Sequence, residues 1–150
     1  MINLQINEEY QDQVQGEKLE KAAKSALHHL NLDPEPDLAI VITDDDQLQT
    51  LNREYLGIDK PTDVLSFPSG DPDPDSGLVN LGDILISYPT AKAQAEEAGH
   101  DIVDELTLLV VHGLLHLLDY DHDTPENKSR MWGIQEEILR EFGIEVKPNE

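Results

Sequence analysis

The segment from Leu106 to Leu118 is the stretch that most restricts how this chain can fold. Its residues are apolar on nearly every side of a helix, and His112 and His116 lie among them. A helix that is apolar all round lies inside a protein, and this segment is too short to cross a bilayer. We therefore expect a central buried helix with the remaining elements packed around it.

Strand and helix patterns alternate along the rest of the chain. Apolar runs and alternation predict strands at residues 2–6, 37–43, 64–67 and 78–87. Helical spacing and capping residues predict helices at 17–30, from 43 or 44 to about 55, at 89–98, at 102–118 and from 124 to 143. This mixture predicts an α+β or α/β sandwich, with helices packed on a sheet of about four strands, in one domain covering residues 1–150.

The composition excludes several kinds of chemistry. The chain has no cysteine, so disulfides, cysteine zinc sites, iron–sulfur clusters and thiol catalysis are excluded. Its first ten residues lack both a basic and an apolar region, so we do not expect a secretory signal. We expect a soluble cytoplasmic protein.

The charge is strongly unbalanced, with 10 Lys and Arg against 32 Asp and Glu, a formal net charge of −22. Such a field repels nucleic acids and anionic membranes. We interpret it as a solvated surface or as the complement of a basic partner protein. Lys18, Lys21 and Lys24 form the one basic stripe, which we interpret as a solvated helix face, although an RNA backbone would be attracted there.

Three histidines have the spacing of metal ligands. His112 and His116 are four residues apart, which places both imidazoles on one helix face. Buried imidazoles need a partner for each nitrogen. A chain that turns back after the helix can bring His122 to the same point. Three neutral nitrogens leave a fourth tetrahedral position for water, as in catalytic zinc sites.

The simpler alternative for any one histidine is a structural role. We interpret His28 and His29 as surface or helix-edge residues and His100 as structural, because none of them has such partners along the sequence. Gly113 stands where the helix of a zinc protease carries its general base, a glutamate directly after the first histidine. This argues against the ordinary peptidase mechanism and assigns most of the activation to a metal-bound water.

Residues 112–122, HGLLHLLDYDH, resemble the signature of the YbeY family of bacterial single-strand-specific metallo-endoribonucleases. Residues 51–68, with PTDVLSFP at their end, and residues 81–87 match the family in the same order. The resemblance implies a zincin-like α+β fold with a mixed sheet, and zinc on the central helix held by His112, His116 and His122. It also implies cleavage of single-stranded RNA in 16S rRNA 3′ end maturation and ribosome quality control. The implied partners are rRNA and the ribosome or a basic ribosomal protein, and we expect neither DNA nor a membrane.

The chain departs from the family pattern at two positions. Leu56 follows Tyr55 where family members commonly have an arginine that contacts RNA phosphate, and Asp119 replaces a glycine. We predict that Arg53 or Lys60 supplies the missing positive charge. The simpler interpretation of Arg53 is an exposed helix charge.

Several assignments stay open. Asp83 or Asp121 is expected to accept a hydrogen bond from a histidine ligand. Thr62, Asp63 and Ser66 are expected to line the cleft, although turn capping also explains Thr62 and Asp63. Three imidazoles do not distinguish zinc from other divalent transition metals. Two other functions remain possible: a metallopeptidase or small-substrate hydrolase, and a non-catalytic, ribosome-associated metal-binding module.

Overall fold

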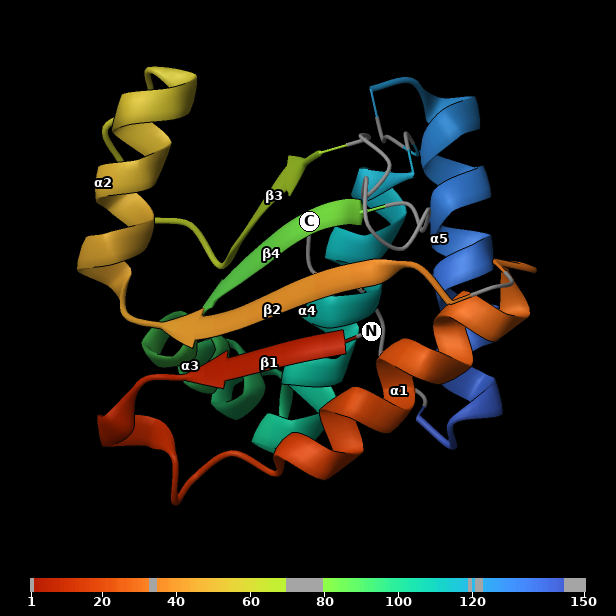
Figure 1. Ribbon diagram of the computed structural model, residues 1–150, viewed down its shortest axis with the longest axis horizontal. Coiled ribbons are helices and arrows are strands. Elements are labelled where there is room, and N and C mark those ends of the chain that lie inside the picture. The colour runs from red at the N-terminus through yellow and green to blue at the C-terminus, as the bar shows by residue number, and fades with distance from the viewer. Residues whose placement is uncertain (1, 33–34, 70–79, 119, 121–122, 145–150) are drawn as a thin grey trace.

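A mixed four-stranded sheet with helices on both faces forms the framework of the protein (Figure 1). The structure is a computed structural model that describes residues 2–32, 35–69, 80–118, 120 and 123–144. The strands are β1 (Ile2–Ile6), β2 (Asp37–Thr43), β3 (Val64–Pro68) and β4 (Asn80–Ser87), in the order β1-β2-β4-β3. β1, β2 and β4 run parallel, and β3 pairs antiparallel with β4. The predicted α+β class and mixed sheet are confirmed.

The helices also follow the predicted pattern. They are α1 (Gly16–His29), α2 (Asp45–Leu56), α3 (Tyr88–Ala98), α4 (Ile102–Leu117) and α5 (Pro125–Glu141). A short 3-10 helix, η1 (Glu8–Tyr10), was not predicted, because a single turn carries too little periodicity to detect. Most of the acidic loop predicted from Pro68 to Gly77 lies outside the described residues.

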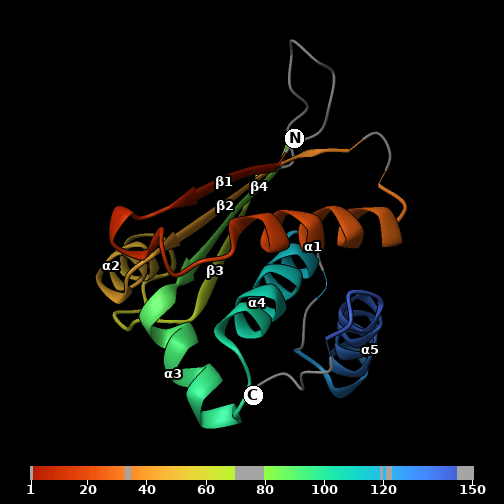
Figure 2. The same cartoon turned by 90° about the horizontal axis from the view of Figure 1, so that it is seen from below.

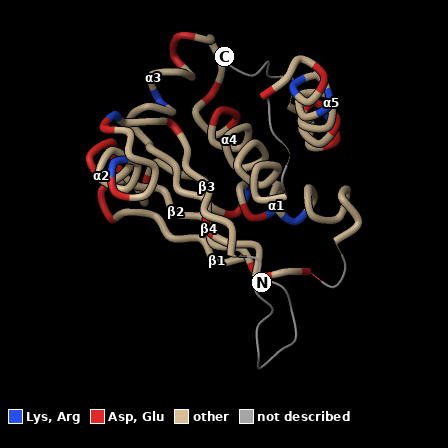
Figure 3. The backbone as a smooth tube through the Cα atoms, turned by 90° about the horizontal axis from the view of Figure 1, so that it is seen from above, with Lys and Arg blue, Asp and Glu red and all other residues tan. Residues whose placement is uncertain are grey.

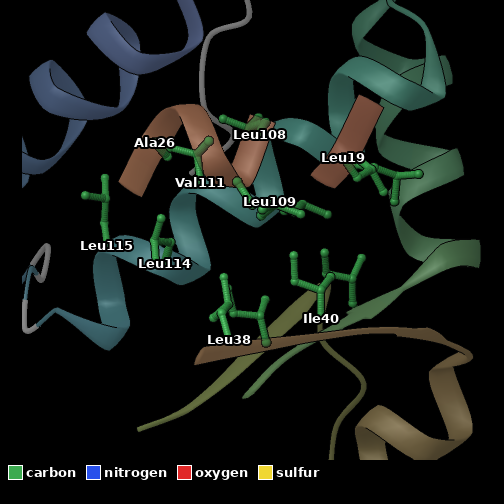
Figure 4. Packing of buried hydrophobic residues seen from close by; sticks show 14 of the residues in the cluster. Leu19, Ala26, Leu38, Ile40, Leu108, Leu109, Val111, Leu114 and Leu115 are labelled. Carbon is green, nitrogen blue, oxygen red and sulfur yellow. The ribbon is translucent and has the colours of Figure 1, made fainter. Parts of the chain in front are cut away.

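Helix α4 is the buried centre of the molecule, as expected. Figure 2 shows α1, α3, α4 and α5 on the same side of the sheet. Side chains from α1, β2 and α4 interlock in the main core (Figure 4), among them Leu19, Ala26, Leu38, Ile40, Leu109 and Leu114. Each fully buried leucine or isoleucine side chain contributes about 1.5–3 kcal/mol, so α4 is held firmly against the sheet.

A second, smaller core covers the opposite face of the sheet. Leu48 of α2 packs with Leu65 of β3 and Leu85 of β4. Leu85 alternates along β4 with Ile84 and Ile86, which belong to the main core. The sheet therefore separates α2 from α4, and β3 lies at its edge beside both helices.

The acidic residues of α4, Asp104 and Glu105, both lie in its first turn. Figure 3 shows most of α4 without charge, whereas acidic and basic positions mark α1, α2 and α5. Lys18, Lys21 and Lys24 are all exposed on α1, in agreement with a solvated helix face. Within the described part of the chain, no helix has the length and apolar character needed to cross a membrane.

Candidate metal centre

His112 and His116 point their imidazoles toward each other from the C-terminal half of α4. Their Nε2 atoms are 3.1 Å apart, and the rings meet edge to face with centroids 4.6 Å apart. Both residues are partly exposed, although their neighbours on the helix are mostly buried. The i, i+4 spacing therefore brings two imidazole nitrogens to one accessible point, as the sequence predicted.

The separation of the two nitrogens fits a shared metal ion. Two ligands at 2.0–2.1 Å from a tetrahedral zinc ion lie about 3.3 Å apart, close to the observed 3.1 Å. Two imidazole lone pairs at this distance repel each other unless a cation or a proton lies between them. Imidazole nitrogens bind zinc, copper, iron and nickel, so these two residues fit a divalent transition metal.

Gln135 of α5 orients the first of these rings. Its Oε1 lies 3.0 Å from Nδ1 of His112, and its side chain is fully buried. An amide oxygen only accepts hydrogen bonds, so Nδ1 donates the proton and Nε2 keeps its lone pair toward His116. This is the arrangement in which a neutral imidazole acts as a metal ligand through Nε2.

The sequence analysis did not identify Gln135, although a signal was present. Gln135 lies four residues after Met131 and three before Ile138, on the buried stripe of α5. A polar side chain on an apolar stripe needs a hydrogen-bond partner inside the protein. That partner is His112 on a different helix, which no spacing along the chain reveals.

The third predicted ligand, His122, lies outside the described residues, as do Asp119 and Asp121. Tyr120, which is described, has contacts with both α4 and α5. The amide of Tyr120 donates to the carbonyl of Leu115 at 3.0 Å, and Arg130 of α5 lies over the Tyr120 ring at 5.3 Å. No group of three His, Cys, Asp or Glu side chains forms a metal site within the described residues, which do not include His122.

Gly113 faces the sheet, which explains why no glutamate stands there. A Cβ atom at this position would lie 2.8 Å from Cγ2 of Ile84 and 3.1 Å from the hydroxyl of Ser66. The Ser66 hydroxyl donates to the Gly113 carbonyl at 3.0 Å. A glutamate at 113 would push into β4 instead of reaching a substrate. Close packing of α4 on the sheet is therefore incompatible with the base of a zinc protease at this position.

A pocket of about 390 Å³ borders the two histidines. It is lined by Leu56, Thr62, Asp63, Val64, Leu65, Ser66, His112 and His116. The expectation that Thr62, Asp63 and Ser66 line the cleft is confirmed. The Asp63 carbonyl accepts from the amide of Ser87 at 2.9 Å, and the Asp63 carboxylate accepts from Gln94 at 3.4 Å. This wall of the pocket is thus tied to the junction of β4 and α3.

Arg53 lies one turn before Leu56 on α2, and its guanidinium is directed toward Asp59. The Arg53 Nη1 and Asp59 Oδ1 atoms are 3.7 Å apart, with both side chains more than half exposed. The carbonyl of Lys60 accepts from Asn52 at 2.9 Å. Leu56, not Arg53 or Lys60, is among the described residues that line the pocket.

Asp83 does not lie beside the histidines. It is exposed on β4 and alternates with Ile84, whose side chain packs in the core that contains α4. The acceptor for Nδ1 of His112 is Gln135. Of the two acceptors expected from the sequence, Asp83 is therefore not beside the histidines, and Asp121 lies outside the described residues.

His28, His29 and His100 are not among the described residues that line the pocket. His28 is exposed. His29 lies 2.7 Å from a carboxylate oxygen of Glu141 and so connects α1 to α5. His100 Nε2 lies 2.7 Å from Oε1 of Glu105, which is only 1% exposed. Burial raises the pKa of the Glu105 carboxyl, and the hydrogen bond from His100 opposes that rise.

Comparison with known proteins identifies the family. The model of the Endoribonuclease YbeY family matches residues 3–143. The chain belongs to the YbeY family. It is 43% identical over 155 residues to the Endoribonuclease YbeY of Acetivibrio thermocellus, covering 95% of each protein. It is also 43% identical over 141 residues to that of Persephonella marina, covering 93% of this chain and 92% of the relative.

A solved structure supports the fold. A Thermotoga maritima protein, determined in solution, superposes with a TM-score of 0.60 at 24% identity, covering 95% of this chain and 92% of that one. YbeY proteins are metal-dependent endoribonucleases that act in rRNA maturation, so the chain belongs to a family of RNA hydrolases. The resemblance seen in the sequence is confirmed, and the family favours a nuclease over the peptidase and non-catalytic alternatives.

Proposed function

We propose that this YbeY protein is a zinc-dependent endoribonuclease that cleaves single-stranded RNA at a metal held by His112, His116 and His122. The 3.1 Å separation of two Nε2 atoms at the edge of a pocket is the observation that carries this proposal. His122 completes the set by its place in the family motif. When bound, the ion would supply Lewis acidity that activates water and polarises a phosphate oxygen.

The side chains around the pocket prepare it for RNA. Gln135 holds His112 in the tautomer that binds metal through Nε2. Ser66 and Thr62 already donate their hydroxyl protons, to Gly113 and to Asp63. Each hydroxyl therefore presents an oxygen acceptor to the pocket. The ribose 2′-OH is the donor that distinguishes RNA from DNA, and it fits these acceptors.

We propose that Arg53 contributes a contact to a phosphate near the metal. Its pairing with Asp59 is exposed and long, and such pairs contribute little free energy. The guanidinium is therefore free to exchange this partner for an RNA phosphate, and its planar fork suits that ligand. Lys60 is the alternative source of positive charge.

The biological setting follows from the family and the charge. We propose that residues 1–150 act as one domain in 16S rRNA 3′ end maturation and ribosome quality control, in the cytoplasm. A net charge of −22 slows the approach of RNA. A basic ribosomal protein beside the substrate would offset this repulsion, which favours RNA that is already part of a ribosomal particle.

Metal analysis and RNA cleavage together test the proposal. We expect the purified protein to contain one zinc ion per chain and to cleave a single-stranded RNA. His112→Ala, His116→Ala and His122→Ala should each lower both zinc content and cleavage. His28→Ala replaces an exposed histidine of α1 and should change neither.

Two results would contradict the proposal. One is full zinc retention in all three ligand variants. The other is a zinc-loaded protein that leaves single-stranded RNA intact, including the 3′ end of precursor 16S rRNA in ribosomal particles. Mapping that 3′ end with and without the protein tests the role in maturation, because the expected product is shorter than the precursor.

A further inference from the structure

The large exposed apolar side chains of the described residues gather in one short segment. They are Tyr55, 68% exposed, Leu56, 57% exposed, and Ile58, 49% exposed. Single exposed apolar residues are common, but a contiguous group of large ones marks a binding surface. We refer to these three residues as the α2 platform.

The α2 platform is held in place by the end of its helix. Gly57 adopts a φ of 71°, which suits glycine at a helix end. Its amide donates to the Arg53 carbonyl at 3.1 Å, and the amide of Ile58 donates to the Asn52 carbonyl at 3.2 Å. The Asn52 side chain, only 4% exposed, donates to the carbonyl of Lys60 at 2.9 Å. The exposed side chains therefore project from an ordered turn.

An aromatic contact further orders the platform. The Tyr55 ring meets the Phe67 ring edge to face, with centroids 5.4 Å apart. Phe67 belongs to β3, whose residues Leu65 and Ser66 line the pocket. Holding an aromatic ring before a ligand arrives reduces the entropy lost on binding. Tyr55 is thus an exposed ring that is already oriented.

The α2 platform is continuous with the pocket that borders the two histidines. Leu56 is one of its three members and also lines the pocket with His112 and His116. When an RNA strand has a phosphate at the histidines, a neighbouring nucleotide of the same strand therefore reaches the platform. The part of that nucleotide that fits the platform is its base, because the base is flat and largely apolar.

Electrostatics also favour a base over a phosphate at this position. The chain carries a net charge of −22, and Leu56 provides no cation. Base stacking on aromatic rings does not depend on net charge and tolerates any sequence. A stacked base would supply affinity that the acidic surface does not supply through the RNA backbone.

We propose that the α2 platform binds an unpaired nucleobase of the RNA strand, with the base stacked on Tyr55 and packed against Leu56 and Ile58. This inference rests on the proposed function, because it places the base beside the scissile phosphate. It names a recognition element for unpaired bases, since a base in a duplex is already stacked and paired.

Binding measurements with abasic RNA test the inference. The probe is a short, fluorescein-labelled single-stranded RNA, read by anisotropy with the zinc-loaded full chain in the first seconds after mixing. Tyr55→Ala should weaken binding by about tenfold, within the range for one stacked base. Tyr55→Phe keeps the ring and should bind as the unchanged protein does. A series of RNAs, each abasic at one position, should include one on which Tyr55→Ala has no further effect.

The salt dependence provides a second readout. Tyr55→Ala removes no phosphate contact, so the slope of log Kd against log salt should stay the same. Leu56→Arg adds a cation beside the pocket and should steepen that slope by about one, the change expected for one additional phosphate contact. Thermal unfolding of each variant confirms that it is folded.

The outcomes separate this inference from the proposed function. If the unchanged protein binds but Tyr55→Ala binds equally well, or loses the same affinity on every abasic RNA, the nucleobase site is overturned and the platform belongs to another kind of partner. If the unchanged protein binds no single-stranded RNA at all, the proposed function fails with it. Cleavage activity does not enter either comparison.

Discussion

Nδ1 of His112 on α4 lies 3.0 Å from Oε1 of Gln135 on α5, and this hydrogen bond joins the two helices at the candidate metal centre. The Trp132 ring of α5 meets the His112 ring edge to face, with centroids 5.5 Å apart, and so adds a second contact from α5. The ring of His112 is therefore fixed both in orientation and in tautomer. Because α5 supplies both contacts, the packing of this helix helps to orient His112 at the candidate metal centre.

Replacing Gln135 should weaken metal binding without unfolding the protein. Gln135→Leu keeps the volume but removes the acceptor, so we expect zinc affinity to fall by about 10- to 100-fold. Gln135→Glu keeps an acceptor oxygen and should retain most of the affinity. Competition with a chromogenic chelator measures the affinity, and ¹⁵N chemical shifts of His112 report its tautomer in the metal-free protein. An unchanged tautomer and affinity in Gln135→Leu would show that the hydrogen bond only stabilises packing.

Gly113 offers a test of how closely α4 approaches the sheet. Gly113→Ala places a Cβ atom 2.8 Å from Cγ2 of Ile84, and overpacking of this kind destabilises a core by about 1–3 kcal/mol. Gly133 is a matched control in the interior of α5, because nothing lies within 4 Å of a Cβ atom added there. Gly133→Ala should stabilise by about 0.5–1 kcal/mol through helix propensity. Urea unfolding of both variants measures the difference, and a stabilising Gly113→Ala would contradict the close approach.

Much of the fold was predictable because local patterns agree with the packed structure. Apolar periodicity located every strand and α-helix to within about two residues in the described part of the chain. The continuous apolar surface of α4 also predicted its burial, since such a helix has no polar face to expose. The i, i+4 spacing of His112 and His116 predicted that their rings meet.

The features of the site that the sequence did not predict depend on contacts between distant segments of the chain. Gln135 and His112 are 23 residues apart and lie on different helices. The sequence shows that Gly113 stands in place of a glutamate. It does not show the physical reason, which is the close approach of Ile84 on β4. Asp83 or Asp121 is expected beside a histidine from the sequence, and the alternation of β4 places Asp83 on the other face of the sheet. A sequence pattern predicts which face of a helix or strand is buried. It does not predict which residue of another element contacts that face.

The proposed phosphate contact of Arg53 should appear in the salt dependence of RNA binding. Arg53→Ala should weaken binding of all single-stranded RNAs alike and lower the slope of log Kd against log salt by about one. Asp59→Asn removes the carboxylate that now pairs with Arg53 and should strengthen binding. Lys60→Ala tests the alternative cation. Equal slopes for Arg53→Ala and the unchanged protein would leave Arg53 as an exposed helix charge.

Glu105 should make the stability of the protein depend on pH. Its carboxyl is buried beside His100, and burial raises its pKa, with a further contribution from the charge of Asp63. Between the ordinary pKa of a glutamate and this raised value, the folded state binds more protons than the unfolded state. Stability therefore falls as pH rises through that window, because ionisation is easier in the unfolded chain.

Glu105→Gln removes the ionisation and keeps an oxygen that accepts from His100. The free energy of unfolding of this variant, relative to the unchanged protein, should increase from about pH 4 upward and level off once the native carboxyl has ionised. Glu97→Gln, an exposed position on α3, controls for the change in net charge. Urea unfolding across this range measures both differences. A difference between Glu105→Gln and the unchanged protein that stays constant with pH would contradict this prediction, because the Glu105 carboxyl would then ionise equally easily in the folded and unfolded states.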